Sequence, residues 1–182
     1  MTPADPFWQL WAVLLAVVPG ILLGGVLIRV GRGRLSPAML GVSMAFGALA
    51  ALVCVILTIA EQRILPGLGF IGKATTTAFV FAGLIEETAK LTVTLVFIYP
   101  FVRADSARRI VLATAGVALG FALLENVGTV LKVAASWERI AVSRAFLTVP
   151  FHTLLGIYVG YGLARAKGLG RAAAVTRIGR TL

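Results

Sequence analysis

The amino-acid sequence predicts an all-α integral membrane protein, a polytopic transmembrane bundle of about five spans, and three observations support this fold class. First, 59% of its 182 residues are hydrophobic and only 13% are charged. A soluble domain of this length needs more polar residues than this to cover its surface. Second, the charged residues fall mainly between apolar runs of about 20 residues or more, the length that crosses a bilayer. Third, Lys and Arg gather just outside those runs. We therefore expect a single integral membrane domain over residues 1–182.

The apolar runs give the order of the spans. We expect them at 7–30, 38–60, 76–100, 107–132 and 140–164. The first run lacks a positive n-region and ends in arginine, so we interpret it as a permanent anchor rather than a cleaved signal peptide. Segment 61–75 contains Pro66 and several glycines and is too short to span. We expect it to be a linker, with a lid lying in the outer interface as the alternative.

The positions of Lys and Arg predict how the bundle is oriented. Loops 29–34 and 103–109 and the tail 165–182 carry most of the basic residues. The opposite side has fewer: Arg63, Lys73, Lys132 and Arg139. By the positive-inside rule, the N-terminus should face outside and the basic tail the cytoplasm. The three tryptophans then fall at the outer interface as aromatic anchors: Trp8, Trp11 and Trp137.

The formal net charge of +10 does not indicate a nucleic-acid partner, because the basic residues lie where juxtamembrane charges are expected. The lipid bilayer is the expected surrounding instead. Cys54 is the only cysteine, which excludes a disulfide within the chain and a two-cysteine metal site. Since it lies in an apolar run, we interpret it as a small buried side chain.

Apart from the basic residues at the span ends, charged side chains and the only histidine fall inside the predicted spans: Glu86, Glu87, Lys90, Glu125, Arg144 and His152. Each charged side chain near the centre of a membrane helix costs roughly 2.5–3.5 kcal/mol on the insertion scale. Three glutamates against one lysine and one arginine leave one negative charge, which a shared proton would cancel. Ionisable residues placed at this cost usually serve function, so we expect a polar functional site.

Helical spacing places these residues on common faces. Glu86, Glu87 and Lys90 lie within one arc of the third span, with Glu86 and Lys90 as an i,i+4 ion pair. In the fourth span Glu125 shares a face with Phe121, Gly128 and Thr129. Asn126 lies about 100° away from Glu125 around the helix.

The fifth span presents Arg144, Thr148 and His152 on one face, at steps of four residues. Pro150 beside them removes a backbone N–H and frees the carbonyl of Phe146. Counted from the outer end of each span, Glu86, Glu125 and His152 fall in the outer half of the bilayer. A pocket that opens outward follows if the three helices pack face to face.

These residue types suit hydrolysis. Water needs a base to attack an amide, and the amide nitrogen needs an acid as it leaves. Two neighbouring carboxylates in a low dielectric share a proton readily and can do both. A divalent metal such as zinc could be held by Glu86, Glu125 and His152, although one histidine with carboxylates is oxygen-rich for zinc and the H-E-x-x-H motif is absent. Hydrolysis with and without a metal both remain open.

Three motifs, "EETAK" from Glu86, "GFALLEN" with Glu125, and "RAFLTVPFHTLLGIYVG" with His152, resemble the signature motifs of the PrsW family of intramembrane proteases. The resemblance covers residues 76–164. It implies an endopeptidase of the bacterial plasma membrane that cuts membrane-anchored proteins, with anti-sigma factors as one kind of substrate, on the extracytoplasmic side.

The PrsW family is in turn similar to the CAAX-type and bacteriocin-processing membrane proteases. The resemblance implies that Glu86 is the base that activates water and that His152 belongs to the third motif. This chain differs at two places, with Glu125 where those proteases have a histidine and Gly156 where they have an asparagine.

The leading hypothesis is thus an intramembrane endopeptidase. Glu86 would be the general base, Glu87 would support it or share its proton, and Glu125 and His152 would bind water or a metal. The supporting residues would tune charge and stabilise the oxyanion: Lys90, Asn126 and Arg144. Two alternatives stay open: a proton- or cation-coupled transporter, because carboxylate and histidine relays also mark ion paths, and a non-catalytic membrane scaffold. The sequence leaves the oligomeric state open.

Overall fold

The computed structural model describes residues 7–64, 69–102 and 106–167, and within these ranges the chain is helical, with no strand. The elements in chain order are α1 (Trp8–Gly31), α2 (Pro37–Ile64), α3 (Phe70–Thr75), η1 (Thr76–Ile85), α4 (Glu86–Val93), η2 (Thr94–Ile98), α5 (Tyr99–Val102), α6 (Ala107–Lys132), η3 (Ala134–Ser136), α7 (Trp137–Phe146) and α8 (Thr148–Ala166). Within the described ranges, four helical stretches are long and apolar enough to cross a membrane: Trp8–Gly31, Pro37–Ile59, Ala107–Lys132 and Trp137–Ala166. The predicted all-α polytopic membrane bundle is confirmed.

The helices follow the predicted spans, with differences in the third span, in the linker and in the fifth span. The third predicted span, 76–100, lies in a run of shorter elements from α3 to α5, in which η1 and η2 have π-type backbone hydrogen bonding. The linker expected at 61–75 is largely helical, because α2 continues to Ile64 and α3 begins at Phe70. The predicted tail, 165–182, lies outside the described residues beyond Lys167.

The fifth predicted span is interrupted. Helix α7 ends at Phe146, Leu147 has φ −110° and ψ −61°, and α8 begins at Thr148. Pro150 therefore lies in the first turn of a new helix, where its missing N–H leaves no helical hydrogen bond unmade. The break lets Arg144 and His152 belong to two helices with independent directions.

Short polar residues set where helices begin. The Ser36 hydroxyl accepts a hydrogen bond of 3.1 Å from the Met39 N–H, and Pro37 follows as the first residue of α2. Ser106 caps α6 in the same way by accepting from the Arg109 N–H. Between α1 and α2 the chain turns through Arg32 and Gly33, whose φ angles are 36° and 79°. A glycine takes this left-handed conformation without strain.

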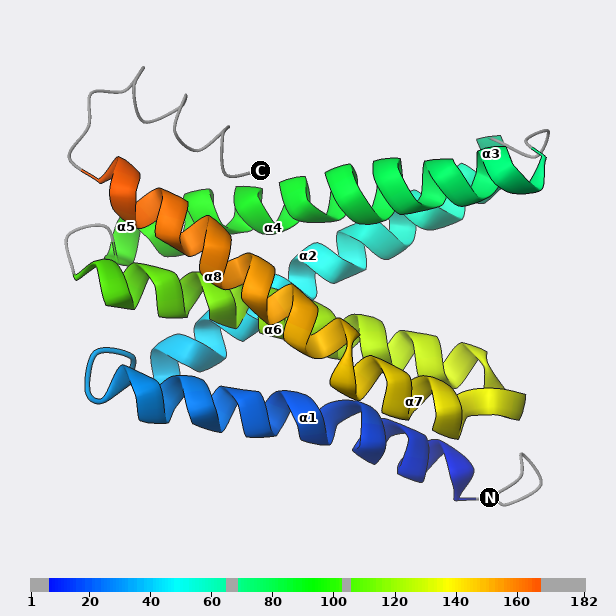
Figure 1. The fold of residues 1–182 in the computed structure, drawn as a ribbon, viewed down its shortest axis with the longest axis horizontal. Helices are drawn as coiled ribbons and strands as arrows, with labels where there is room; N and C mark the ends of the chain where they lie inside the picture. Colours follow the sequence, from blue (N-terminus) through cyan, green and yellow to red (C-terminus); the bar gives the residue numbers. More distant parts are fainter. Residues whose placement is uncertain (1–6, 65–68, 103–105, 168–182) are drawn as a thin grey trace.

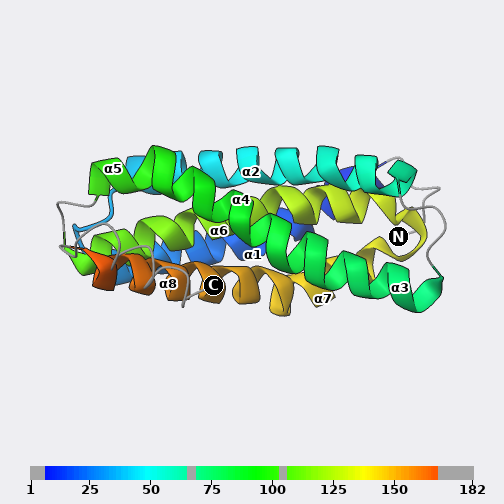
Figure 2. The same ribbon diagram turned by 90° about the horizontal axis from the view of Figure 1, so that it is seen from above.

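Helix α6 lies at the centre of the bundle (Figures 1 and 2), in contact with α1, α2, α7 and α8. In its most apolar window 72% of residues are buried, against 28% in the corresponding windows of the other three spanning stretches. The outer helices keep large apolar side chains exposed, such as Leu22 and Ile56. Such surfaces fit contact with lipid rather than water.

Glycines allow α2 and α8 to approach α6 closely. A Cβ added to Gly120 would lie 2.0 Å from the carbonyl oxygen of Met44, and one added to Gly156 would lie 3.0 Å from the Cα of Ala115. Gly116/Gly120 and Gly156/Gly160 have the GxxxG spacing typical of closely packed membrane helices. Backbone contact at these points fixes the depth at which the polar residues of α6 and α8 meet.

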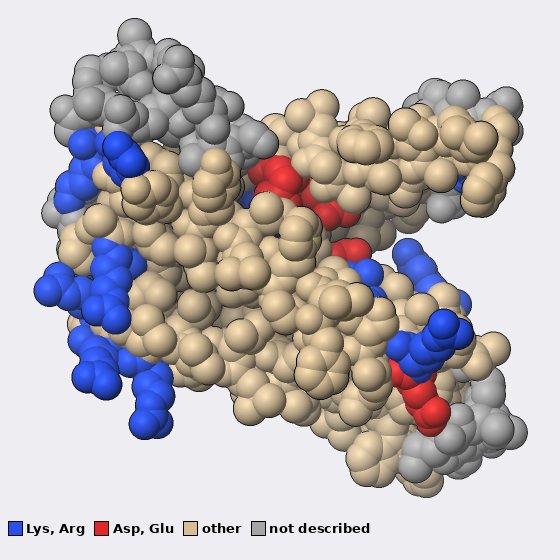
Figure 3. Space-filling view, in the orientation of Figure 1, with Lys and Arg blue, Asp and Glu red and all other residues tan. Residues whose placement is uncertain are grey.

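Many of the basic side chains gather at one end of the bundle. The end where α1 and α8 finish and α6 begins carries a group of basic side chains, seen at the left of Figure 3; it includes Arg29, Arg32, Arg108 and Arg165. Arg108 donates a hydrogen bond to the carbonyl of Val30 near the C-terminus of α1. The assignment of this end to the cytoplasm stays a prediction.

Two of the tryptophans, Trp8 and Trp137, lie at the opposite end, where α1 and α7 begin (Figure 1). The interpretation of Trp137 as an interfacial anchor is wrong, because its side chain is only 5% exposed and packs in a cluster with Ala12, Ala16 and Val130. Trp8 is half-buried against the same cluster. Small residues on α1 leave space for the Trp137 ring. This packing cannot be predicted from the position of Trp137 at the end of a span.

We expect Gly120→Ala to destabilise the bundle, because the added methyl group meets the backbone of α2 and overpacking of this kind costs about 1–3 kcal/mol. Gly41→Ala is the matched control, since an added Cβ there has no atom within 4 Å. Thermal unfolding in detergent should show a lower midpoint for Gly120→Ala and an unchanged or slightly higher one for Gly41→Ala. Equal midpoints would contradict the close contact between α2 and α6.

Candidate active site

The polar site is organised around the ammonium group of Lys90, which is 5% exposed. Its Nζ lies 2.5 Å from Oε1 of Glu87 and 3.0 Å from Nδ1 of His152. It also stands 4.2 Å from the centre of the Phe121 ring, on its face. Lys90 thus joins α4 to α6 and α8. The expected i,i+4 pair with Glu86 is not formed; the lysine turns toward Glu87, three residues earlier, because this direction also reaches His152.

The contact with Lys90 determines the tautomer of His152. An ammonium group only donates hydrogen bonds, so Nδ1 must accept and the ring proton of a neutral imidazole lies on Nε2. Nε2 lies 3.2 Å from Oε2 of Glu125, where its N–H can donate to the carboxylate. The ring is buried and packs beside Phe121, with ring centres 5.6 Å apart. His152 is therefore held on both nitrogens.

Glu125 and Asn126 are joined to α7 through Arg144. Nη2 of Arg144 lies 2.8 Å from Oε1 of Glu125, as an ion pair without the angle of a hydrogen bond. Nε of Arg144 donates a hydrogen bond of 2.6 Å to Oδ1 of Asn126, which is 1% exposed. Arginine only donates, so the Asn126 amide must present its oxygen to Arg144. Nδ2 of Asn126 finds no hydrogen-bond acceptor among the described residues.

These contacts form one continuous network across four helices. It runs from Glu87 through Lys90, His152, Glu125 and Arg144 to Asn126. The structure thus brings six of the seven predicted site residues into a single set of contacts. Arg144 and Asn126 meet where α7 packs against α6.

Glu86 is the predicted site residue outside this network. Within the described part of the chain, no hydrogen bond or ion pair holds its carboxylate. Ligand atoms of Glu86, Glu125 and His152 nevertheless all lie within 4.8 Å of one another. Glu86 therefore faces the fixed pair of Glu125 and His152 without being fixed itself.

A groove of about 610 Å³ leads to this point between α2, η1 and α6. Glu86 and Glu125 lie in its wall, and Figure 3 shows acidic side chains at the inner end of a notch in the surface. The predicted face of α6 is confirmed, because the groove is lined by Phe121, Glu125, Gly128 and Thr129. Cys54 is buried as expected and also borders the groove.

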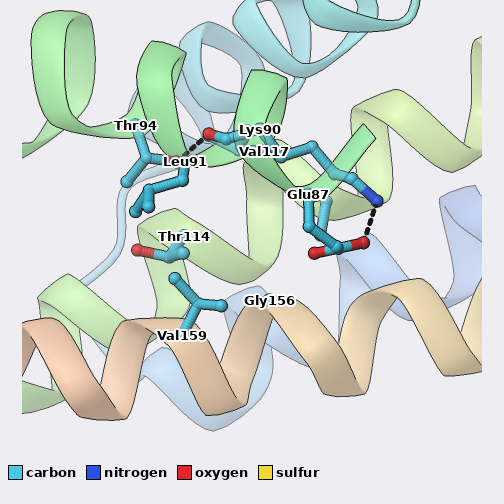
Figure 4. Close-up of a pocket in the computed structure, with 9 residues that line it drawn as sticks. Glu87, Lys90, Leu91, Thr94, Thr114, Val117, Gly156 and Val159 are labelled. Carbon is cyan, nitrogen blue, oxygen red and sulfur yellow. Dashed lines mark hydrogen bonds and ion pairs between the residues drawn. The ribbon is translucent and has the colours of Figure 1, made fainter. Parts of the chain in front are cut away.

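Glu87 lies apart from that groove. With Lys90, Thr94 and Thr114 it lines a separate cavity of about 10 Å³ between α4, α6 and α8 (Figure 4). A space of this size holds about one water molecule. The two neighbouring glutamates therefore have different surroundings, Glu86 in the groove and Glu87 against Lys90. Consecutive residues of a helix point about 100° apart. Helix α8 packs on the side of Glu87 and not on the side of Glu86, so the two carboxylates have different environments.

Two residues that line the groove were not predicted from the sequence, Lys132 and Thr77. Lys132 lies at the end of α6 and Thr77 in η1. A signal for Lys132 was present, because it lies seven residues after Glu125 and so on the same helical face.

We expect Lys90→Met to lower the free energy of unfolding by about 3 kcal/mol, because it leaves the half-buried carboxylate of Glu87 without its partner. Glu87→Gln added to it should recover part of this loss. A double-mutant cycle in detergent measures the coupling, which should be about 1 kcal/mol or more. Strictly additive effects would show that the contact between Lys90 and Glu87 contributes nothing.

Comparison with known families and proteins places the site in context. Residues 36–181 match the family described as "PrsW family intramembrane metalloprotease". Protease PrsW of Geobacillus kaustophilus (strain HTA426) is 33% identical over 106 residues, which are 58% of this chain and 46% of that protein. Protease PrsW of Clostridioides difficile (strain 630) is 26% identical over 157 residues, 85% of this chain and 65% of that protein.

Protease PrsW of Bacillus subtilis (strain 168) is 32% identical over 90 residues, 50% of this chain and 40% of that protein. This chain spans about half the length of the curated relatives that it matches. No solved structure matches it. The long apolar helices and the extent of the family match together lead to one conclusion: the chain is a multi-pass membrane protein that belongs to the PrsW family of intramembrane metalloproteases.

Proposed function

We propose that this protein is an intramembrane endopeptidase that hydrolyses peptide bonds of membrane-anchored proteins in the bacterial plasma membrane. Membership of the PrsW family supports the reaction class. The single observation that carries the mechanism is the position of Glu86, at the inner end of a groove and close to Glu125 and His152, yet outside the network that holds both.

In this mechanism Glu86 is the general base. A water molecule between Glu86 and Glu125 gives a proton to the Glu86 carboxylate while its oxygen attacks the carbonyl carbon of the scissile peptide. Glu86 then passes that proton to the amide nitrogen as the C–N bond breaks, which releases an amine and a carboxylic acid. A base has to approach both water and leaving group, so freedom from fixed contacts suits Glu86.

The fixed residues supply position and charge. Glu125, held by Arg144 and His152, orients the water. The Nε2–H of His152 and the positive charge of Arg144, both next to Glu125, would stabilise the negative charge that develops on the carbonyl oxygen. Glu87, Lys90 and Asn126 act through these residues, since Lys90 is buried against His152 and Asn126 is bonded to Arg144.

The family description implies a metal, and the donor set fits one. Two carboxylates and one imidazole with ligand atoms within 4.8 Å of one another can supply the three protein ligands of a catalytic zinc site. Glu86, Glu125 and His152 would hold the ion; because Nε2 must then be free of its proton, the ring proton would lie on Nδ1, and Lys90 would face it as a neutral amine. A bound zinc ion supplies an acidified water molecule and polarises a carbonyl group.

We expect Glu86→Gln to abolish cleavage while the protein still inserts, because an amide cannot accept the proton of water. The measurement compares new protein N-termini in cells that express wild type or variant at matched levels. Peptides that begin in or just outside a partner's span should appear only with wild type.

Glu138→Gln is the matched control, since Glu138 is exposed on α7 and does not line the groove. Full cleavage by Glu86→Gln would remove Glu86 from the mechanism. If no N-terminus distinguishes the two under several envelope stresses, the protein is not a protease under those conditions. Ion flux that depends on Glu86 in liposomes would then identify a transporter, and retained partner binding alone a scaffold.

A further inference from the structure

The groove that ends at Glu86 does not stop at the outer end of α6. A second cavity, of about 350 Å³, adjoins it along η1, and the two share Thr77 and Ala82 in their walls. These shared residues indicate a path from the carboxylates to the surface of α3. The path is far larger than a water molecule or an ion requires, and its volume falls within the range of 300–1,000 Å³ typical of ligand sites.

The charged residues that line this path are arranged by sign. Glu86 and Glu125 stand at the inner end, while Lys132 of α6 and Lys73 of α3 stand toward the outside. Both lysines are exposed. Figure 3 shows acidic side chains deep in the notch, next to one Lys or Arg side chain, and further Lys or Arg side chains near its mouth. The wall that α2 contributes is mainly apolar, with Ala51, Val55 and Ile59 beside Thr58.

We propose that this path binds the substrate chain, and that Lys73 and Lys132 select membrane-anchored proteins with Asp or Glu in the segment just outside the span. The inference rests on the proposed protease function and specifies its substrate class. An apolar segment fits the wall of α2, and an acidic segment beyond it meets the two lysines. A substrate with a basic segment would be repelled by the two lysines. The lysines therefore attract acidic substrates and also exclude basic ones.

The spacing along α6 predicts where the acidic residue lies. Lys132 is seven positions after Glu125, which corresponds to about 10 Å along the helix axis. An extended chain covers this distance in about three residues. The acidic residue should therefore lie about three positions from the cleaved bond on the outer side, with a second one farther out opposite Lys73.

The test compares new N-termini from cells that express wild type, Glu86→Gln, Lys73→Glu/Lys132→Glu or Arg139→Glu. Arg139 is the matched control, because it is exposed at the same end of the bundle and lines neither cavity. Proteins whose cleavage depends on Glu86 should carry an acidic outer segment. The double variant should lower their cleavage by about tenfold, and Arg139→Glu should leave it unchanged.

Charge reversal in the substrate completes the test. Replacing the acidic residues of one identified substrate by lysine should lower its cleavage by wild type and restore it with Lys73→Glu/Lys132→Glu. Loss without such rescue would mean that the lysines act on lipid headgroups or on the fold, and would overturn the inference. Glu86-dependent cleavage of proteins without acidic segments would also overturn it while leaving the protease function intact; absence of all Glu86-dependent cleavage would remove both.

A second variant tests the path itself without changing charge. An added Cβ at Gly128 has no atom within 4 Å, so Gly128→Phe should fill the groove without disturbing helix packing. We expect it to abolish cleavage with an unchanged unfolding midpoint. Gly41→Phe, on an exposed face of α2 with equally open surroundings, should cleave normally. Normal cleavage by Gly128→Phe would exclude this groove as the substrate path.

Discussion

The contact between the Lys90 ammonium and the His152 ring is the interaction on which the rest of the site depends. A charge near the middle of a membrane helix costs roughly 2.5–3.5 kcal/mol on the insertion scale, so a buried lysine persists only with partners. Here a carboxylate, an imidazole lone pair and an aromatic face provide them, from Glu87, His152 and Phe121. Because these partners belong to three helices, satisfying one charge also fixes how α4 and α8 meet on α6.

The consequences extend outward from that contact. A fixed His152 presents its Nε2 to Glu125, Arg144 Nη2 lies against the other oxygen of Glu125, and Asn126 Oδ1 accepts a hydrogen bond from Nε of Arg144. The rigid side of the site is thus built without Glu86, which stays available at the end of the groove. We interpret this division as the basis of the proposed chemistry, in which fixed groups orient water and stabilise charge while one unfixed carboxylate moves a proton. In the same proposal, Lys73 and Lys132 lie farther out along the path and select the substrate by its charge.

Periodicity and polarity alone were sufficient to predict the fold class, the faces that turn inward and the set of polar residues that meet. Helical faces are local properties, so Glu125 and Gly128 could be placed on one wall from their spacing. What could not be predicted depends on contacts between helices. Lys90 pairs with Glu87 and not with Glu86 because this direction also brings its ammonium group to His152. Trp137 is buried because it packs against small residues of α1. A pocket was predicted among the third, fourth and fifth spans, but the wall that α2 adds to the groove could not be foreseen, because it depends on a contact between helices.

The most direct test of this account is a ¹⁵N NMR measurement on His152, the only histidine in the chain, in metal-free protein in detergent micelles. Imidazole nitrogens with and without a proton have well separated shifts, so one labelled residue reports the tautomer. The account predicts a neutral ring with the proton on Nε2 and an acceptor at Nδ1, and a change of the Nδ1 signal in Lys90→Met. A proton on Nδ1, or a spectrum that Lys90→Met leaves unchanged, would contradict the contact that organises the site.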